Sequence, residues 1–318
     1  MPSLSHTSLT TTPLPSLGQV YSAMFDELVK RINAAVGGER GVAIGVLDIF
    51  GFEIFEKNSF EQLCINFTNE RLQQKFNSHT FTQEESLYVA EGAPFDKVPF
   101  LDNTPVLELL SAKKPQLGVL ILLDEEVRTP QGSDAKWLAK ISERHGANPV
   151  FGSGSGAGCN GFSFLIRHYA GTRSRRASDA GRRTTRARTA PQRTPPHPST
   201  GDVPYDTRGF VEKNADKLSR NLYALLAGAA EGRTRALFPP KSDAEAGKKA
   251  STVAEKFRGQ LTKLMTTVER TRPFFIRCIK PNQQKLPAGT AGSLQMKMTI
   301  EQLTYAGVFE AVKIRKMG

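Results

Sequence analysis

A nearly continuous apolar run that ends in an aspartate constrains this chain most strongly. Residues 41–48 read GVAIGVLD, a pattern typical of a strand that is buried on both faces of a parallel sheet. Open α/β sheets bind their ligands at the carboxyl ends of such strands. Asp48 lies at that end, and Gly51 follows three residues later. The sequence therefore predicts a strand of an α/β fold, with Asp48 at the end where such a sheet would bind a ligand.

Asp48 and Gly51 fit two alternatives. A carboxylate at a strand end can hold Mg²⁺ directly or through water, and a glycine lets its backbone N–H approach a terminal phosphate. An aspartate in this position can equally cap the helix that follows. The spacing alone does not decide between a phosphate site and a helix cap.

A helical period begins after residue 58. Apolar side chains recur at i, i+3, i+4 and i+7 and then continue the same stripe. They are Phe60, Leu63, Cys64, Phe67, Leu72 and Phe76. This pattern predicts a long amphipathic helix over residues 58–83, with one face against a core. Cys64 on that face is predicted to be a packed side chain and not a reactive thiol.

Residues 48–77, DIFGFEIFEKNSFEQLCINFTNERLQQKFN, resemble the switch II loop and relay helix of myosin motor domains. Other segments resemble that family in the same order, namely residues 21–33, 91–110, 117–134, 164–171, 205–219, 274–282 and 303–318. The resemblance implies an actin-based motor of the cytoplasm and cytoskeleton that hydrolyses MgATP. Its fold would be a partial, P-loop-NTPase-like mixed sheet with long helices and a largely helical actin-binding subdomain, with residues 41–47 and 274–278 as strands of one sheet.

The resemblance also implies roles for three residues after the first strand. Asp48 would hold Mg²⁺ through water, Gly51 would donate its N–H to the γ-phosphate, and Glu53 would pair with an arginine of switch I. However, the sequence contains no GxxxxGK(S/T) motif and no switch I segment. We therefore expect ATP and Mg²⁺ to bind weakly if at all, and we expect no ATP hydrolysis by this chain on its own.

Two segments resemble actin-facing parts of the family. Residues 117–140 resemble a helix-loop-helix, in which Val127, Pro130 and Trp137 are candidate actin contacts; Trp137 is equally a candidate core anchor. Residues 239–251 correspond to a basic surface loop in which Lys248 and Lys249 would face the acidic actin surface. A solvated linker is the alternative for that loop. Actin is the expected partner. The chain would bind it either as part of a motor or as a nucleotide-independent actin-binding module.

A basic insert interrupts the resemblance. Residues 172–201 contain eight arginines and one acid, Asp179, and removing them lowers the net charge from +12 to +5. They contain no aromatic or large aliphatic residue, so we expect them to be disordered. They are either a translated intron or a lineage-specific basic loop. Arginine runs without aromatics make only non-specific phosphate contacts, so nucleic acid is not an expected partner.

These observations divide the chain into four parts. Residues 1–18 are a foreign, disordered start, residues 19–171 and 202–318 are motor-like, and residues 172–201 are the insert. The resemblance stops where a converter and lever arm would begin, so light chains are not expected to bind these residues. The longest apolar runs fall well short of about 18 residues, so no membrane span is predicted.

Overall fold

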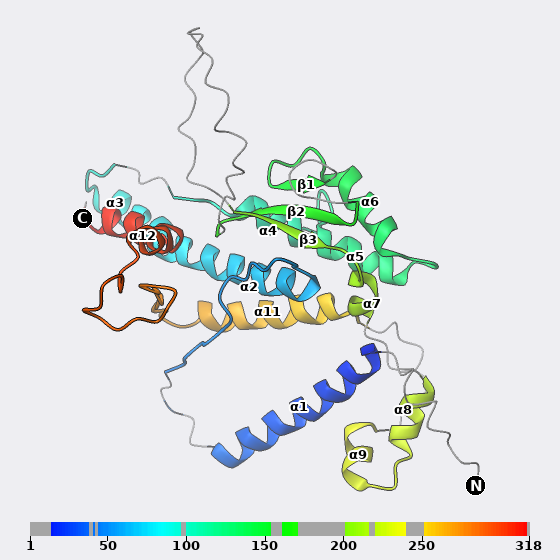
Figure 1. Ribbon diagram of the computed structural model, residues 1–318. Coiled ribbons are helices and arrows are strands. Elements are labelled where there is room, and N and C mark those ends of the chain that lie inside the picture. Colours follow the sequence, from blue (N-terminus) through cyan, green and yellow to red (C-terminus); the bar gives the residue numbers. More distant parts are fainter. Residues whose placement is uncertain are drawn as a thin grey trace.

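The computed structural model describes residues 14–37, 41, 44–96, 100–153, 161–170, 201–215, 220–239 and 251–316. Among them the elements are mostly helical and are arranged around one small sheet (Figure 1). The helices are α1 (Leu14–Val36), α2 (Phe60–Asn77), the π-helix η2 (Ser78–Thr82), α3 (Gln83–Glu91), α4 (Thr104–Ser111), α5 (Val119–Arg128), α6 (Asp134–His145), α7 (Phe210–Ala215), α8 (Arg220–Ala227), α9 (Gly232–Leu237), α11 (Val253–Glu269), α12 (Met296–Tyr305) and α13 (Val308–Arg315).

The sheet has three antiparallel strands in the order β1 (Phe151–Ser153), β2 (Ser163–His168) and β3 (Gly201–Asp206). β2 and β3 pair without interruption from Ser163 opposite Asp206 to His168 opposite Gly201. Gly201, which the sequence placed at the end of the insert, is therefore the first residue of β3. The predicted insert otherwise lies outside the described residues.

The helix predicted over residues 58–83 is confirmed and extends further. α2 begins after Ser59, whose side chain forms a capping box with Gln62. η2 then joins α2 to α3, so the helical path reaches Glu91. The apolar stripe faces inward as expected, and burial raises the pKa of the Cys64 thiol to about 12. Cys64 is therefore a packed side chain, as its position in the stripe predicts.

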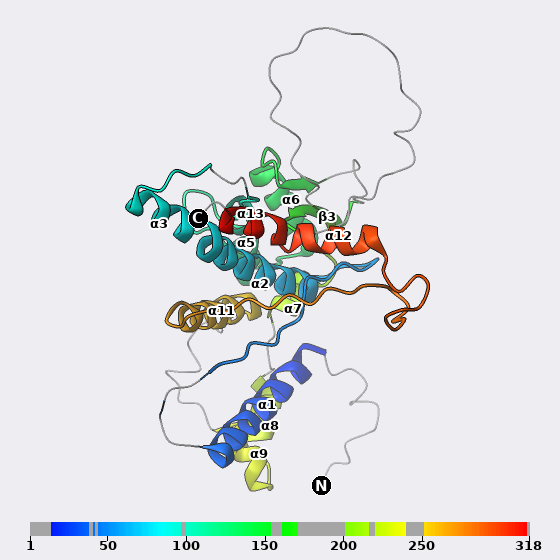
Figure 2. The ribbon, with the colours of Figure 1, turned by 90° about the vertical axis from the view of Figure 1, so that its left-hand side faces the viewer.

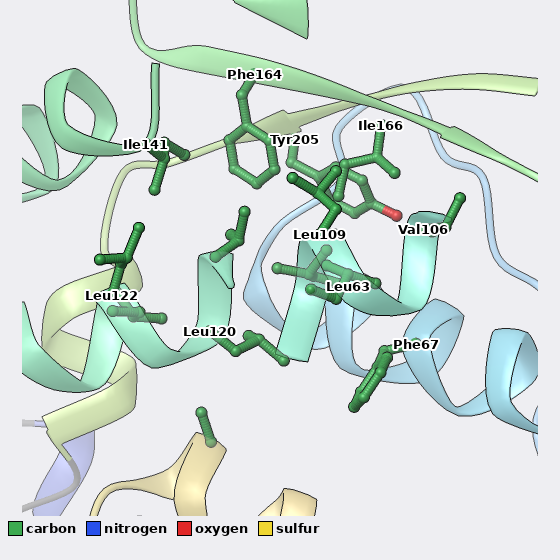
Figure 3. Packing of buried hydrophobic residues seen from close by; sticks show 14 of the residues in the cluster. Leu63, Phe67, Val106, Leu109, Leu120, Leu122, Ile141, Phe164, Ile166 and Tyr205 are labelled. Carbon is green, nitrogen blue, oxygen red and sulfur yellow. The ribbon is translucent and has the colours of Figure 1, made fainter. Parts of the chain in front are cut away.

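The main hydrophobic core lies between α2, the sheet and the α4, α5, α6 and α11 helices (Figure 3). Leu63, Leu120 and Leu122 have no exposed surface there. α11 runs beside α2 in both views (Figures 1 and 2), and Phe67 and Phe257 join the two helices with ring centroids 6.3 Å apart. The described part of the chain is thus largely helical, with one small antiparallel sheet.

A second apolar cluster gathers around η2 and includes Phe76, Phe81, Tyr88 and Ile314. Phe81 stacks on Phe100 at 4.8 Å between ring centroids, and the Tyr88 hydroxyl donates to the Ile314 carbonyl at 3.2 Å. The end of the helical path from α2 is thus attached to α13.

The predicted mixed sheet is wrong for the described residues. Residues 44–50 form no strand, and the side chains of Ile44 and Val46 are 95% and 90% exposed. Residues 274–278 form no strand either, and Ile276 is 86% exposed. A buried strand needs neighbours that pair with its backbone on both edges, and no described segment pairs with these two.

α1, α8 and α9 lie together below the main body (Figures 1 and 2). The α1 helix includes residues 21–33, one of the segments that resemble the family. None of the helices described is both long enough and apolar enough to cross a membrane.

Candidate functional site

The Asp48–Glu53 region forms no helix or strand and lies against α2, with contacts to Asn66 and Asn69. Asp48 and Gly51 are exposed, whereas Glu53 is half-buried. A Cβ atom added to Gly51 would meet no atom within 4 Å, so no described part of the chain encloses this glycine. The structure thus brings the three predicted residues into one segment but builds no cradle around Asp48 and Gly51.

Two asparagines of α2 hold this segment. The side chain of Asn66 accepts a hydrogen bond from the Glu53 N–H and donates another to the Glu53 carbonyl, both at 2.8 Å. Asn69 donates to the Phe50 carbonyl at 3.0 Å. The Glu53 carboxylate also accepts a long hydrogen bond from Gln62, at 3.4 Å. The segment is therefore attached to α2 chiefly through its backbone.

A buried polar chain continues from Asn66 to the sheet. Asn66 donates a hydrogen bond to the Tyr205 hydroxyl at 2.8 Å. The same hydroxyl lies 2.8 Å from Nε2 of His168. Nδ1 of His168 lies 2.9 Å from the carboxylate of Glu70, which also accepts from Asn103 at 2.6 Å. Burial is the main cause that raises the pKa of Tyr205, so its hydroxyl stays protonated.

Sequence reasoning missed this chain of polar groups. One signal was available, because Asn66 and Glu70 are four residues apart on the inward face of an amphipathic helix. Polar side chains at such positions need buried partners. Their partners come from β2, β3 and the residue before α4, which local spacing cannot identify.

The residues described do not fit an MgATP site. Asp48 is a single exposed carboxylate, and the described part of the chain holds no group of three or more His, Cys, Asp or Glu side chains that could bind a metal. Mg²⁺ takes near-octahedral oxygen coordination, and nucleotide phosphates need several N–H donors and a cation. We derive no chemical step through this segment.

The α5–α6 tip, residues 128–133, forms a second candidate site. Arg128, Pro130 and Gln131 are exposed, and Val127 beside them is half-buried. Gln131 has a left-handed φ of 55°, and Lys136 donates to its carbonyl at 2.9 Å.

The buried carboxylate of Glu126 holds the backbone of the α5–α6 tip in place. It accepts from the Ser133 N–H at 3.2 Å and pairs with Lys140 at 2.7 Å. A Cβ atom at Gly132 would lie 2.1 Å from the Glu126 carbonyl oxygen, so the loop requires glycine there. The exposed residues of the tip are thus held in one conformation.

Trp137 lies in the core and not on the tip surface. It has no exposed surface, its indole N–H donates to the Val119 carbonyl at 3.3 Å, and its ring stacks on Phe210 at 5.1 Å. Of the two alternatives for this residue, the core anchor is the one that the structure shows, and the surface contact is corrected. A large aromatic side chain on the inner face of α6 gains more from burial than from exposure. Lys248 and Lys249 lie outside the described residues.

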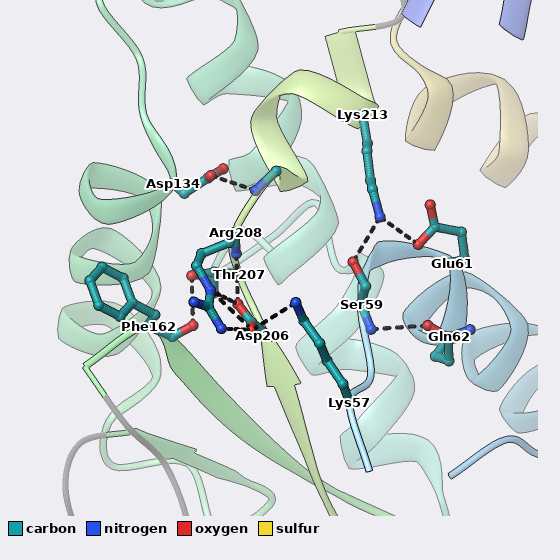
Figure 4. Close-up of polar contacts among 11 residues, drawn as sticks. Lys57, Ser59, Glu61, Gln62, Asp134, Phe162, Asp206, Thr207, Arg208 and Lys213 are labelled. Atoms are coloured by element: carbon teal, nitrogen blue, oxygen red, sulfur yellow. Dashed lines mark hydrogen bonds and ion pairs between the residues drawn. The ribbon is translucent and has the colours of Figure 1, made fainter. Parts of the chain in front are cut away.

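Polar contacts join β3 and α7 to the start of α2 (Figure 4). Arg208 forms an ion pair with Asp206, and its hydrogen bond lowers the pKa of that carboxyl to about 2. Lys213 donates to the Ser59 hydroxyl and to Glu61, both at 2.9 Å. The two contacts of Lys213 hold α7 against the first turn of α2.

Comparison with known proteins identifies the family. The myosin head (motor domain) family model matches residues 15–179 and 197–318. The chain is 41% identical over 302 residues to the high molecular weight form of myosin-1 from Acanthamoeba castellanii, 38% over 309 residues to myosin-2 from Arabidopsis thaliana and 38% over 307 residues to myosin-I heavy chain from Dictyostelium discoideum. Each match covers 94% of this chain, but 17%, 22% and 11% of the respective relative.

The chain therefore belongs to the myosin motor domain family, as the resemblance of residues 48–77 predicted. It spans less than a quarter of the length of these three relatives. The family match leaves residues 180–196 uncovered, and these lie inside the predicted insert.

Proposed function

We propose that this chain is an actin-binding part of a myosin heavy chain and that the exposed α5–α6 tip is its contact with the actin filament. The observation that carries the proposal is the fixed geometry of that tip. Arg128, Pro130 and Gln131 are exposed on a loop that Glu126 and Gly132 hold from within. A surface that is already ordered loses little conformational entropy on binding.

The chemistry of the tip suits an acidic partner surface. Arg128 supplies a cation, and Pro130 and Val127 supply apolar surface beside it. A cation at the rim of an interface speeds association with an acidic partner and makes binding sensitive to salt. Lys248 and Lys249 stay part of the proposal as a second cationic contribution, on the evidence of sequence alone.

Co-sedimentation of the 318-residue chain with actin filaments tests this function. We expect Arg128→Glu and Pro130→Glu each to weaken binding by about tenfold, because each places a carboxylate where the acidic partner surface would lie. Lys297→Glu is the matched control, because it makes the same charge change on an exposed residue of α12. Equal losses in Arg128→Glu and Lys297→Glu would show that only net charge matters, and the α5–α6 tip would then not be the contact.

A second function, a part in MgATP hydrolysis, comes from the family match, because the described residues by themselves do not fit an MgATP site; the Asp48–Glu53 region is attached to α2 through Asn66 and Asn69. We propose that this attachment serves the motor family's reaction only when further residues complete the phosphate site. Steady-state phosphate release with and without actin tests this, and we expect no turnover by the 318-residue chain. Actin-stimulated turnover by this chain would contradict the proposal.

A further inference from the structure

A buried carboxylate, Asp124, joins three helices that are far apart in the sequence. It lies on α5, is 3% exposed, and accepts a hydrogen bond from Asn214 of α7 at 3.0 Å. It also accepts from the hydroxyl of Thr252, the residue that caps α11, and forms an ion pair with Arg258 of α11 at 2.5 Å. One side chain therefore binds α7 and both the cap and the second turn of α11.

The partners of Asp124 reinforce this joint. Asn214 has no exposed surface, and its side-chain oxygen accepts from the Ala254 N–H at 2.7 Å. Thr252 accepts from the Glu255 N–H at 3.1 Å. The first backbone N–H groups of α11 are thus bound by side chains that Asp124 itself holds. The first turn of α11 has one position relative to α5.

That position brings an exposed part of α11 to the α5–α6 tip. Arg128 at the end of α5 forms an ion pair with Glu255 in the first turn of α11, at 2.7 Å, and both side chains are partly exposed. An exposed pair of this kind contributes little to stability. Its consequence is geometric, because it sets the direction of the Arg128 guanidinium at the proposed contact surface.

We propose that Asp124 is a positioning residue for actin binding: it holds the first turn of α11 against α5, so that Arg128 and the α11 surface around Glu255 and Lys256 form one docking surface. This inference rests on the proposed function of the α5–α6 tip. It extends the contact surface to a helix that lies more than 120 residues further along the chain, since Arg128 and Glu255 are 127 positions apart.

The test compares Asp124→Asn with Asp206→Asn in the 318-residue chain. Both substitutions remove a carboxylate that pairs with an arginine, but Asp206 binds Arg208 and Lys57 and not α11. Binding to actin filaments is measured at a temperature at which circular dichroism shows every variant to be folded. Hydrogen exchange of residues 251–258 is measured on the same samples.

We expect Asp124→Asn to speed exchange in residues 251–258 and to weaken actin binding by about three- to tenfold. Asp206→Asn should leave both quantities unchanged. The double variant Asp124→Asn/Arg258→Gln should recover part of the affinity, because a neutral amide then faces a neutral amide and no buried guanidinium is left unpaired.

The outcomes separate the two claims. If Asp124→Asn binds actin as tightly as the unaltered chain does, although exchange is faster, the positioning role is refuted and the proposed function stands. If the unaltered chain itself does not sediment with actin, the proposed function fails and this inference fails with it. Equal weakening by Asp206→Asn would assign the effect to general stability and would also overturn the positioning role.

Discussion

Asn66 binds the backbone of Glu53 in both directions, with its amide oxygen accepting from the Glu53 N–H and its amide nitrogen donating to the Glu53 carbonyl, each at 2.8 Å. The same nitrogen also donates to Tyr205. One buried side chain therefore connects the Asp48–Glu53 region, α2 and β3.

Asn66→Ala should destabilise the fold because it leaves the backbone N–H and carbonyl of half-buried Glu53 without their partner and removes one of the two hydrogen bonds of the buried Tyr205 hydroxyl. We expect the free energy of unfolding to fall by about 1–3 kcal/mol. Urea denaturation followed by circular dichroism measures this change. Asn69→Ala is the matched control on the same helix, because the Phe50 carbonyl that Asn69 binds belongs to an exposed residue that water can reach. Similar losses in the two variants would contradict the central role of Asn66.

Trp137→Ala should cost about 3–5 kcal/mol of stability, as large-to-small changes of buried aromatic residues do. Its ring packs against Phe210 and Phe164, and its removal would leave a cavity between α6 and the sheet. Pro130→Ala, on the exposed tip, should change stability by no more than about 0.5 kcal/mol. Thermal denaturation of both variants checks the assignment. A small effect of Trp137→Ala would restore the surface interpretation of this residue.

The local apolar pattern predicted the α2 helix. The apolar period from Phe60 to Phe76 predicts α2 correctly because helix packing depends on residues that are near in sequence. The predicted helix ends at residue 83, whereas the helical path continues through α3 to Glu91, and the π-helix η2 was not predicted; within η2, buried Phe81 packs on Phe100. That contact depends on a residue outside the helix.

Local patterns could not predict the sheet or the buried series of hydrogen-bonded polar groups that begins at Asn66. Residues 41–48 have the composition of a buried strand, but strand formation depends on partners elsewhere in the chain, and Ile44 and Val46 are exposed here. For the candidate site, the sequence placed Asp48, Gly51 and Glu53 in one segment. It could not predict that Asn66 would bind Glu53, or that His168 would face Glu70 across 98 positions.

Stability should fall as the pH is lowered through the range in which His145 titrates. Its Nε2–H donates to the Leu117 carbonyl at 3.0 Å, and its buried Nδ1 has no hydrogen-bond partner. Burial lowers the pKa of His145 below its ordinary value of 6.5, the bond to Leu117 opposes this shift, and nearby Arg144 adds to it. Between the folded-state pKa and the unfolded-state pKa of His145, the folded state binds fewer protons than the unfolded state. The free energy of unfolding therefore rises with pH across this interval, and the stabilisation is lost when the pH falls below the folded-state pKa.

Urea denaturation at pH 7.5 and pH 5.5 tests the effect of His145. The unaltered chain should lose more stability between these two pH values than His145→Gln, whose amide can still donate to Leu117 but does not titrate. The difference between the two losses isolates His145 from the other titrating groups. Identical losses would show that His145 does not contribute to the pH dependence.

Gly307 joins α12 to α13 in a conformation that only glycine adopts without strain. Its φ is +68°, and a Cβ atom there would lie 3.1 Å from Cε1 of Phe76 on α2. Gly307→Ala should therefore destabilise the chain by about 1–2 kcal/mol through the backbone alone, and by more through the contact with Phe76. Gly292→Ala is the control, because Gly292 has a similar φ of +78° but open space around it. The excess loss in Gly307→Ala, measured by thermal denaturation, reports the contact with Phe76.

The double variant Phe76→Leu/Gly307→Ala should lose less stability than the sum of the two single changes, since the smaller side chain relieves the close approach. Strict additivity would show that Phe76 does not limit residue 307.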